Sequence, residues 1–166
     1  MHSEWLPKGE IQHVLAALTA PNRLACEISL ATGLRINDVL ALKPAQLAKR
    51  RFTVREEKTG KTRRIYLPED LRRRALAMAG QHFVFEGRLN GREHRTRQAV
   101  YKDIRRAAAA FRCKEHLSPH SLRKAYAVEE YKRNGGNLKR VQKLLNHSSE
   151  AVTKLYALAD RLSIKK

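Results

Sequence analysis

The chain has 166 residues, of which 42% are hydrophobic, so it is long enough for one domain with a real core. Thirty-five Lys and Arg residues against sixteen Asp and Glu residues leave a formal net charge of +19. Such an excess opposes compaction by self-repulsion unless an anionic partner neutralises it. Nucleic acid is the first candidate for this partner, and an acidic membrane surface is the second. No apolar run approaches the roughly 20 residues that span a bilayer, which excludes an ordinary transmembrane helix within these residues.

The first residues, MHSEWLPKGE, lack the basic and then apolar segments of a signal peptide. The two cysteines, Cys26 and Cys113, do not suggest a disulfide framework. We therefore expect a reduced setting, cytoplasmic and associated with the nucleoid.

Helices are predicted for the first part of the chain. One apolar stripe has the i, i+3, i+4, i+7 spacing of a helix and consists of Ile11, Val14, Leu15 and Leu18. A second helix is expected from about Asn22 to Thr32, with Gly33 in the left-handed conformation that ends a helix. Asn37 is then predicted to cap a short helix. Arg35 would lie in the tight joint between these two helices.

The middle of the chain is predicted to form strands. The stretches RFTVREE (51–57) and TRRIYLP (62–68) are β-branched and aromatic, and they flank KTGK (58–61), which is typical of a hairpin turn. Pro68 should end the second strand. A third short strand is expected from HFVFE (82–86).

The last part of the chain is again predicted to be helical. One helix should run from Thr96 to Ala110, and another should start at Ser118-Pro119 and end at Asn134-Gly135-Gly136. A further helix follows around 138–145, and Ser148 or Ser149 should cap the last one. The predicted fold class is therefore mostly α with a small antiparallel β-sheet (α+β).

Basic residues gather in two stretches. Residues 49–74 contain eleven Lys and Arg but four acids, and a second cluster runs from Arg88 to Arg106. Two solvated faces would be the ordinary interpretation, but the net charge favours a surface that binds a polyanion. The residues that we predict to contact DNA are Lys43, Arg50, Arg51, Lys61, Arg63, Arg64, Arg95, Arg97 and Lys102.

Six residues form an ordered set of possible catalytic groups. Each is unremarkable alone, because a lone histidine, lysine or arginine usually belongs to a cap or a solvated surface. In chain order they are Arg35 after TGL, Lys58 in KTGK, His120 and Arg123 at a helix start, His147 after LLN, and Tyr156 nine residues later.

This arrangement resembles the catalytic domain of the tyrosine recombinase family, the phage integrases and their chromosomal relatives. The match runs from about Leu30 to Tyr156. It implies the breaking-and-rejoining fold, with residues 1–166 as one catalytic domain, encoded by a prokaryote, a phage or another mobile element. About thirty residues precede Arg35, too few for the family's usual N-terminal core-binding domain. We therefore expect either a catalytic-domain fragment or an unusually compact recombinase.

The resemblance also implies a role for each residue. Tyr156 matches the nucleophile, Arg35 the first active-site arginine and Lys58 the hairpin lysine. His120 and Arg123 match the family's H-x-x-R motif, and His147 matches the histidine that ends its LGH motif. Three departures are mild: Asp38 stands in place of Glu, Lys124 in place of a second His, and Asn146 in place of Gly.

The chemistry of phosphodiester cleavage supports the same roles. The reaction needs a nucleophile that stays attached, cations on the non-bridging oxygens, and a proton donor for the leaving 5′ oxygen. Forked guanidinium donors suit the oxygens. Lys58 is the best candidate for the proton donor, and Lys61 in the same hairpin stays open as an alternative. His120 could take the proton of Tyr156, and we expect no metal and no cofactor.

The expected function is thus a site-specific DNA recombinase that forms a covalent 3′-phosphotyrosyl link. Its expected partners are double-stranded DNA, further copies of the chain in a synaptic tetramer, and accessory DNA-bending proteins. Alternatives are type IB topoisomerase activity, a non-catalytic DNA-binding regulator, or a basic protein that coats nucleic acid. A zinc site at Cys113, His116 and His120 has suitable spacing, but a fourth ligand is not evident.

Overall fold

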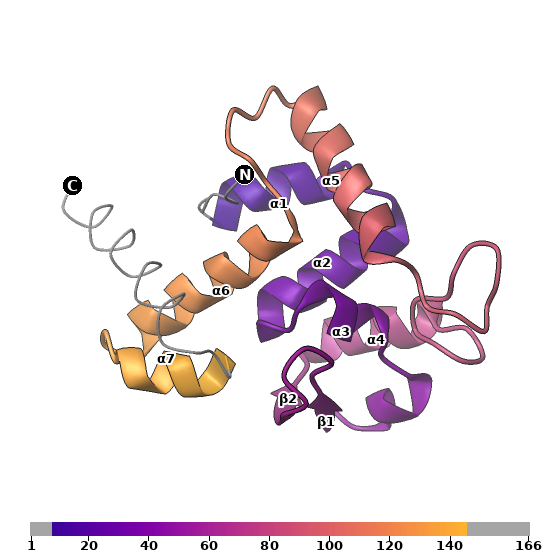
Figure 1. Ribbon diagram of the computed structural model, residues 1–166, viewed down its shortest axis with the longest axis horizontal. Coiled ribbons are helices and arrows are strands. Elements are labelled where there is room, and N and C mark those ends of the chain that lie inside the picture. The colour runs from indigo at the N-terminus through magenta and orange to yellow at the C-terminus, as the bar shows by residue number, and fades with distance from the viewer. Residues whose placement is uncertain (1–7, 146–166) are drawn as a thin grey trace.

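Helices stand above a two-stranded hairpin in the computed structural model, which describes residues 8–145 (Figure 1). In chain order the elements are α1 (Lys8–Ala16), α2 (Ala20–Thr32), α3 (Ile36–Leu40), the 3-10 helix η1 (Pro44–Ala48), β1 (Arg51–Arg55), β2 (Thr62–Tyr66), α4 (Glu69–Met78), α5 (Arg97–Ala110), α6 (Pro119–Arg133) and α7 (Leu138–Leu145). The predicted class, mostly α with a small antiparallel sheet, is confirmed. His147, Tyr156, Asn146 and the predicted cap at Ser148 or Ser149 lie outside the described residues.

The core is built around α2. This helix contacts α1, α3, α4, α5 and α6, and it lies at the centre of the helical part in Figure 1. Its side chains Leu24 and Ile28 are fully buried, together with Leu34 after the helix and Ile104 of α5. Burying one such side chain stabilises the fold by about 1.5–3 kcal/mol. The end of α2 is therefore a firm base for the residues that follow it.

Capping residues fix where α2 ends and where α5 and α6 begin. Gly33 ends α2 with φ 67°, and a Cβ there would lie 2.3 Å from the ring of Tyr126, so only glycine fits. Ser118 caps α6 as predicted, since its Oγ accepts from the N–H of His120 at 3.2 Å. Thr96 caps α5 in the same way through the N–H of Ala99.

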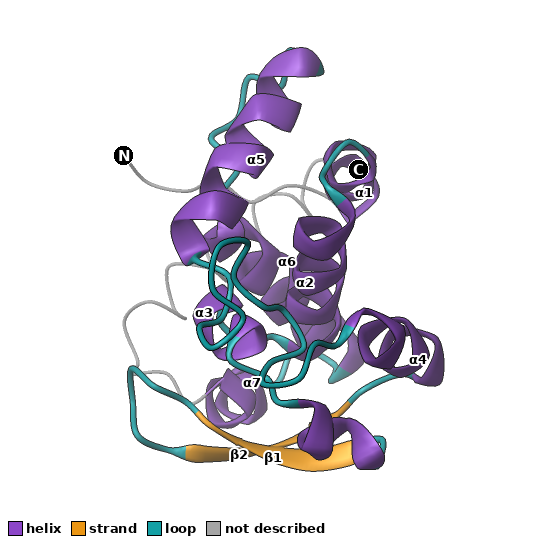
Figure 2. Cartoon of the chain, turned by 90° about the vertical axis from the view of Figure 1, so that its right-hand side faces the viewer, coloured by secondary structure: helices purple, strands orange, loops and turns teal. Residues whose placement is uncertain are grey.

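Strands β1 and β2 pair antiparallel, from Arg51 opposite Tyr66 to Arg55 opposite Thr62. They form the lower edge of the molecule in both views (Figures 1 and 2). The expected third strand at 82–86 is wrong, because within the described residues this segment makes only an isolated bridge between Glu86 and His94. The segment instead fills the core with Phe85, which is fully buried.

One further expectation needs correction, and one helix lies outside the predicted elements. Asn37 does not cap α3; Arg35 occupies the N-cap position, and Asn37 lies inside the helix and donates to the carboxylate of Glu57. Helix α4 was not anticipated, although Pro68 before it and Glu69 and Asp70 in its first turn are typical start signals.

Among the described helices, none has the length and apolar character to cross a membrane.

Candidate active site

Arg35 is held in the joint between α2 and α3, as the sequence predicts. The backbone is fixed before it, where Ser29 Oγ donates to the carbonyl of Leu34 at 2.7 Å. It is fixed after it, where the carbonyl of Arg35 accepts from the N–H of Val39 at 3.1 Å. The Arg35 side chain is 19% exposed, and its Nη1 lies 3.1 Å from Oε2 of Glu56. This guanidinium is thus anchored on one side and open to solvent on the other.

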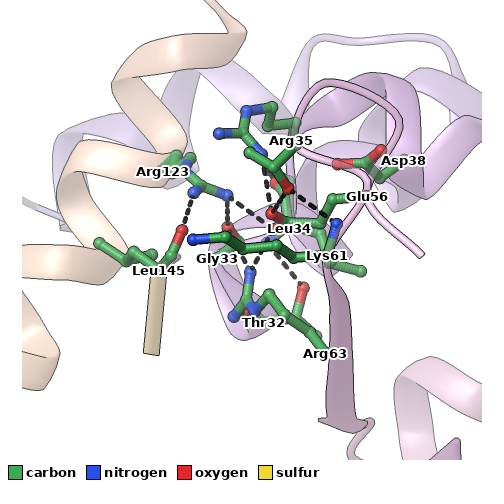
Figure 3. Close-up of polar contacts among 12 residues, drawn as sticks. Thr32, Gly33, Leu34, Arg35, Asp38, Glu56, Lys61, Arg63, Arg123 and Leu145 are labelled. Atoms are coloured by element: carbon green, nitrogen blue, oxygen red, sulfur yellow. Dashed lines mark hydrogen bonds and ion pairs between the residues drawn. The ribbon is translucent and has the colours of Figure 1, made fainter. Parts of the chain in front are cut away.

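Arg123 of α6 reaches the same carboxylate from the other side. It is 3% exposed, and its Nη1 lies 3.7 Å from Oε1 of Glu56. Its Nη1 also donates to the carbonyl of Gly33 at 2.5 Å, and its Nη2 donates to the carbonyl of Leu145 at 2.6 Å (Figure 3). Burial and then the charge of Arg35 lower the pKa of Arg123 to about 10, so it stays charged at neutral pH. Arg123 therefore joins α6 to the ends of α2 and α7.

Glu56 is the fully buried acceptor on which these arginines converge. It follows β1, and it accepts from Arg63 Nη1 at 3.2 Å and from Thr59 Oγ1 at 2.9 Å. Burial alone would raise the pKa of Glu56. The bonds from Thr59 and Arg63, with the charges of Arg35 and Arg63, outweigh burial and hold this pKa below its usual range. The carboxylate is therefore ionised at neutral pH.

Lys58 and Lys61 are exposed in the turn that follows Glu56. The main chain of Glu56 closes this turn, because its N–H donates to the carbonyl of Lys61 at 2.9 Å and its carbonyl accepts from Gly60 at 2.8 Å. The left-handed Gly60, with φ 65°, allows the tight reversal. The two candidate proton donors are thus carried on one short turn attached to the arginine cluster.

His120 lies in the first turn of α6 and keeps contact with solvent. The surrounding chain displaces part of the water from its ring, and this lowers the pKa of His120. The nearby positive charges of Lys124, Arg123, Arg35 and Lys58 lower that pKa further. The structure thus brings four of the six predicted catalytic residues into one neighbourhood; the other two, His147 and Tyr156, lie beyond the described part of the chain.

Asp38, one of the three residues that depart from the family pattern, links α3 to the hairpin. Its Oδ1 accepts from the N–H of Glu57 at 3.0 Å. Its Oδ2 is buried without a hydrogen-bond partner among residues 8–145. Burial raises the pKa of Asp38, against the bond from Glu57 and the charge of Arg35. Asp38 therefore supports the joint that holds Arg35.

Most residues predicted to contact DNA lie on the surface. The exposed ones are Lys43, Arg50, Arg51, Lys61, Arg64, Arg97 and Lys102. Arg50 is paired with Glu69 at 3.4 Å, and half-buried Arg95 donates to Asn22 at 2.5 Å. DNA contact by these residues stays a prediction.

Arg63 differs from that expectation, because its side chain is only 8% exposed. It donates to the carbonyl of Thr32 at 3.0 Å and to that of Gly33 at 3.3 Å, besides its ion pair with Glu56. Arg63 therefore supports the active-site arginines from inside the fold.

Glu56 was missed by the sequence reasoning, although the sequence contains a signal for it. Side chains alternate along a strand, so the inward positions Phe52 and Val54 are followed by 56. An acid at an inward position needs a buried cation. Arg63, inward on β2 opposite Val54, supplies one.

The zinc alternative gains no support from the described residues, in which no group of three His, Cys, Asp or Glu side chains could hold a metal ion. The Cys113 thiol lies 3.4 Å from Oε2 of Glu115. His116 Nε2 lies 3.5 Å from the hydroxyl of Tyr101.

Comparison with known proteins gives consistent matches. The model of the phage integrase family matches residues 4–161. Tyrosine recombinase XerD of Staphylococcus saprophyticus is 28% identical over 178 aligned residues, covering 95% of this chain and 59% of XerD. The integrase of Escherichia phage P2 is 28% identical over 153 residues, covering 92% of this chain and 42% of the integrase.

One solved structure with the same fold is a lambda integrase tetramer bound to a Holliday junction. It superposes with a TM-score of 0.74 at 22% identity, over 93% of this chain and 48% of that one. The present chain spans about half the length of these three proteins. This similarity to a solved structure shows the fold of the chain.

Proposed function

The chain belongs to the phage integrase family, and we propose that it is the catalytic domain of a tyrosine-type site-specific DNA recombinase. The observation that carries the proposal is the convergence of Arg35 and Arg123 on one buried carboxylate, at 3.1 and 3.7 Å. Two guanidinium groups held this way can bind the non-bridging oxygens of one phosphate. His120 lies close enough to Arg35, Arg123 and Lys58 for their charges to lower its pKa, so His120 and Lys58 are available for proton transfer beside the arginines.

Cleavage follows from these roles. The Tyr156 oxygen attacks the phosphorus, the bond between phosphorus and the 5′ oxygen breaks, and the 3′ phosphate stays on the tyrosine as a diester. The proton of Tyr156 passes to His120. The leaving 5′ oxygen takes a proton from Lys58, with Lys61 as the alternative donor, and becomes a hydroxyl.

Rejoining reverses these transfers. The 5′-hydroxyl of a partner strand attacks the phosphotyrosyl phosphorus, loses its proton to the lysine, and releases Tyr156, which regains its own proton. One phosphodiester replaces another, so the exchange needs no ATP. The arginines supply the charge stabilisation for which other phosphoryl-transfer enzymes use metal ions, so we expect cleavage to be independent of added metal.

Duplex DNA is the proposed partner, and the net charge of +19 supports it. The lambda integrase tetramer on a Holliday junction supports a tetramer that pairs two duplexes. Accessory DNA-bending proteins and a place at the nucleoid stay predictions from the sequence. Filter binding should show affinity falling steeply with salt, whereas a slope near zero against log salt would contradict phosphate-dominated binding.

A covalent adduct is the direct test. The wild-type chain is incubated, in the presence of EDTA, with a nicked suicide duplex from which the short 5′-hydroxyl strand diffuses away. A denaturing gel should show protein attached to DNA, and Tyr156→Phe should give none. A wild-type chain without adduct, or a Tyr156→Phe chain that forms one, contradicts the proposal. Supercoil relaxation without pairing of two sites would instead indicate topoisomerase activity.

A further inference from the structure

We propose that Glu56 is a positioning residue that fixes the phosphate-binding arginines relative to the hairpin turn carrying the proton donor. This inference rests on the proposed function. It concerns a group that does not touch DNA, because Glu56 is fully buried. Four side chains meet it, and they come from three separate parts of the chain.

The two oxygens of the carboxylate have different partners. Oε1 faces the interior, with Arg63 Nη1 at 3.2 Å and Arg123 Nη1 at 3.7 Å. Oε2 faces the site, with Arg35 Nη1 at 3.1 Å and Thr59 Oγ1 at 2.9 Å. Figure 3 shows Arg35, Arg63 and Arg123 gathered around this group. A single side chain thus links both arginines of the reaction to the turn.

The interior side of this group is tied to the backbone at the end of α2. Arg63 and Arg123 both donate to the carbonyl of Gly33, at 3.3 and 2.5 Å. Gly33 is itself fixed, since its N–H donates to Ser29 at 2.8 Å and Tyr126 packs where a Cβ would stand. The carboxylate is therefore held against the end of α2 and can serve as a fixed point for its other two partners.

Oε2 of Glu56, on the side of the site, is connected to the turn with the proton donor through Thr59. Thr59 is the neighbour of Lys58 in the turn, and its hydroxyl bond links this turn directly to the Glu56 carboxylate that the arginines share. Arg35 binds the same oxygen. The distance between the phosphate oxygens and the leaving 5′ oxygen is set by the substrate, so the arginines and the lysine must keep a matching separation. Glu56 holds that separation.

The charge balance around Glu56 also supports its role in positioning the arginines. One carboxylate faces three guanidinium groups, so a surplus of positive charge remains for the phosphate. The variant Glu56→Gln keeps the shape but leaves the three cations to repel one another. We expect Arg35 to shift away, which slows cleavage.

The turn link is tested with Thr59→Val, which keeps the shape and removes the hydroxyl, and with Thr59→Ser, which keeps the hydroxyl. Thr53→Val, on the exposed face of β1, is the matched control. Single-turnover cleavage is measured on a suicide duplex with an ordinary scissile phosphate and on one whose bridging 5′ oxygen is replaced by sulfur. A thiolate leaves without a proton, so the second substrate does not need the lysine.

The two substrates should distinguish a defect in the turn that carries the proton donor from a defect in the arginine cluster. Thr59→Val should slow the ordinary substrate by about tenfold or more, as misplaced catalytic groups do, and should approach the wild-type rate with the sulfur substrate. Thr59→Ser and Thr53→Val should match the wild type on both. Glu56→Gln should slow both substrates, because it also displaces Arg35.

The inference is overturned if Thr59→Val cleaves the ordinary substrate at the wild-type rate, or if it slows both substrates equally. Thermal unfolding is followed for every variant, and Thr59→Val decides the matter even if Glu56→Gln does not fold. A wild-type chain that forms no adduct would instead refute the proposed function, so the two failures are distinguishable.

Discussion

Two buried carboxylates, Glu56 and Asp103, form the centres of two polar networks with opposite charge balance. Asp103 of α5 is 8% exposed, and its Oδ1 pairs with Arg106 at 2.6 Å. Its Oδ2 accepts from the N–H and the hydroxyl of Thr19, at 2.9 and 2.8 Å, and from Asn22 at 2.7 Å. One negative charge thus meets one positive charge and three neutral donors.

The Asp103 network is complete in itself. It fastens α5 to the start of α2, where the first N–H groups of a helix need acceptors. Its hydrogen bonds outweigh burial and lower the pKa of Asp103 to about 2. Arg106 neutralises the charge of Asp103, so this network has no net charge with which to attract a ligand. We therefore assign it a role in stabilising the fold.

The Glu56 network has the opposite character. Three guanidinium groups share one carboxylate, and the Arg35 side chain is the one of the three that is partly exposed. Such surplus charge costs stability unless an anion arrives. A balanced buried network thus stabilises the fold, whereas an unbalanced one with a partly exposed arginine is suited to binding an anion. Substitutions in the two networks should therefore separate activity from stability.

Among substitutions in the two networks, Arg35→Ala should have the largest effect on activity. Removing one preorganised donor to a developing phosphate charge should slow cleavage of the suicide duplex by about a thousandfold. The free energy of unfolding should change by less than about 1 kcal/mol, because Glu56 keeps Arg63 and the repulsion between Arg35 and Arg123 disappears. Urea denaturation and single-turnover rates measure the two quantities.

The control for that substitution is Arg73→Ala, on the exposed face of α4. It should leave both quantities unchanged. Arg35→Ala with a normal cleavage rate, or with a stability loss as large as that of the next variant, would remove the distinction between the networks.

Asp103→Asn should show the reverse pattern. The amide loses the charge that Arg106 neutralises and places donors opposite donors, so the free energy of unfolding should fall by about 3 kcal/mol. The cleavage rate of the folded fraction should be that of the wild type. Asp70→Asn, exposed in α4, is the matched control. Loss of cleavage without loss of stability would contradict the structural role of Asp103.

The same carboxylate predicts a dependence of stability on pH. The folded pKa of about 2 lies below the ordinary 3.8, so the stabilisation is present above pH 3.8 and disappears as the pH falls through 2. The difference in unfolding free energy between the wild type and Asp103→Asn should shrink by about 2 kcal/mol between pH 5 and pH 2. Urea titrations at each pH measure this difference, and a constant gap would show that Asp103 titrates normally.

Local signals predicted much of the fold. The bounds of the helices around Gly33 and Ser118 follow from a left-handed glycine and a serine cap, which act within one turn. The third strand at 82–86 failed, because its composition is that of a strand but Phe85 is drawn into the core. A short apolar run has the same local pattern whether it forms a strand or an irregular segment that packs into the core. Tertiary packing decides between the two.

The candidate site divides in a similar way. Arg35, Lys58, His120 and Arg123 could be placed in one site from their order, through the resemblance to a family. Glu56 could not, because its partners Arg35 and Arg123 are remote in sequence and meet only in the folded chain. Whether Arg63 faces DNA or the interior likewise depends on which face of the hairpin packs on α2.

The smallest effect concerns the protonation of His120. Its pKa is lowered by displacement of water and by nearby cations, so the imidazole is neutral at pH 7 and can accept the proton of Tyr156. The acid limb of the cleavage rate should therefore have its midpoint below the ordinary imidazole value of 6.5.

The substitution Lys124→Gln tests this. It removes one cation near His120, so the protonated ring is favoured and the pKa of His120 rises. The acid limb should then move to higher pH by a fraction of a unit. Single-turnover rates from pH 5 to pH 8 measure the shift, with Lys132→Gln at the far end of α6 as the control. A limb that moves to lower pH in Lys124→Gln, or that is the same in a His120→Gln variant, would show that another group accepts the proton.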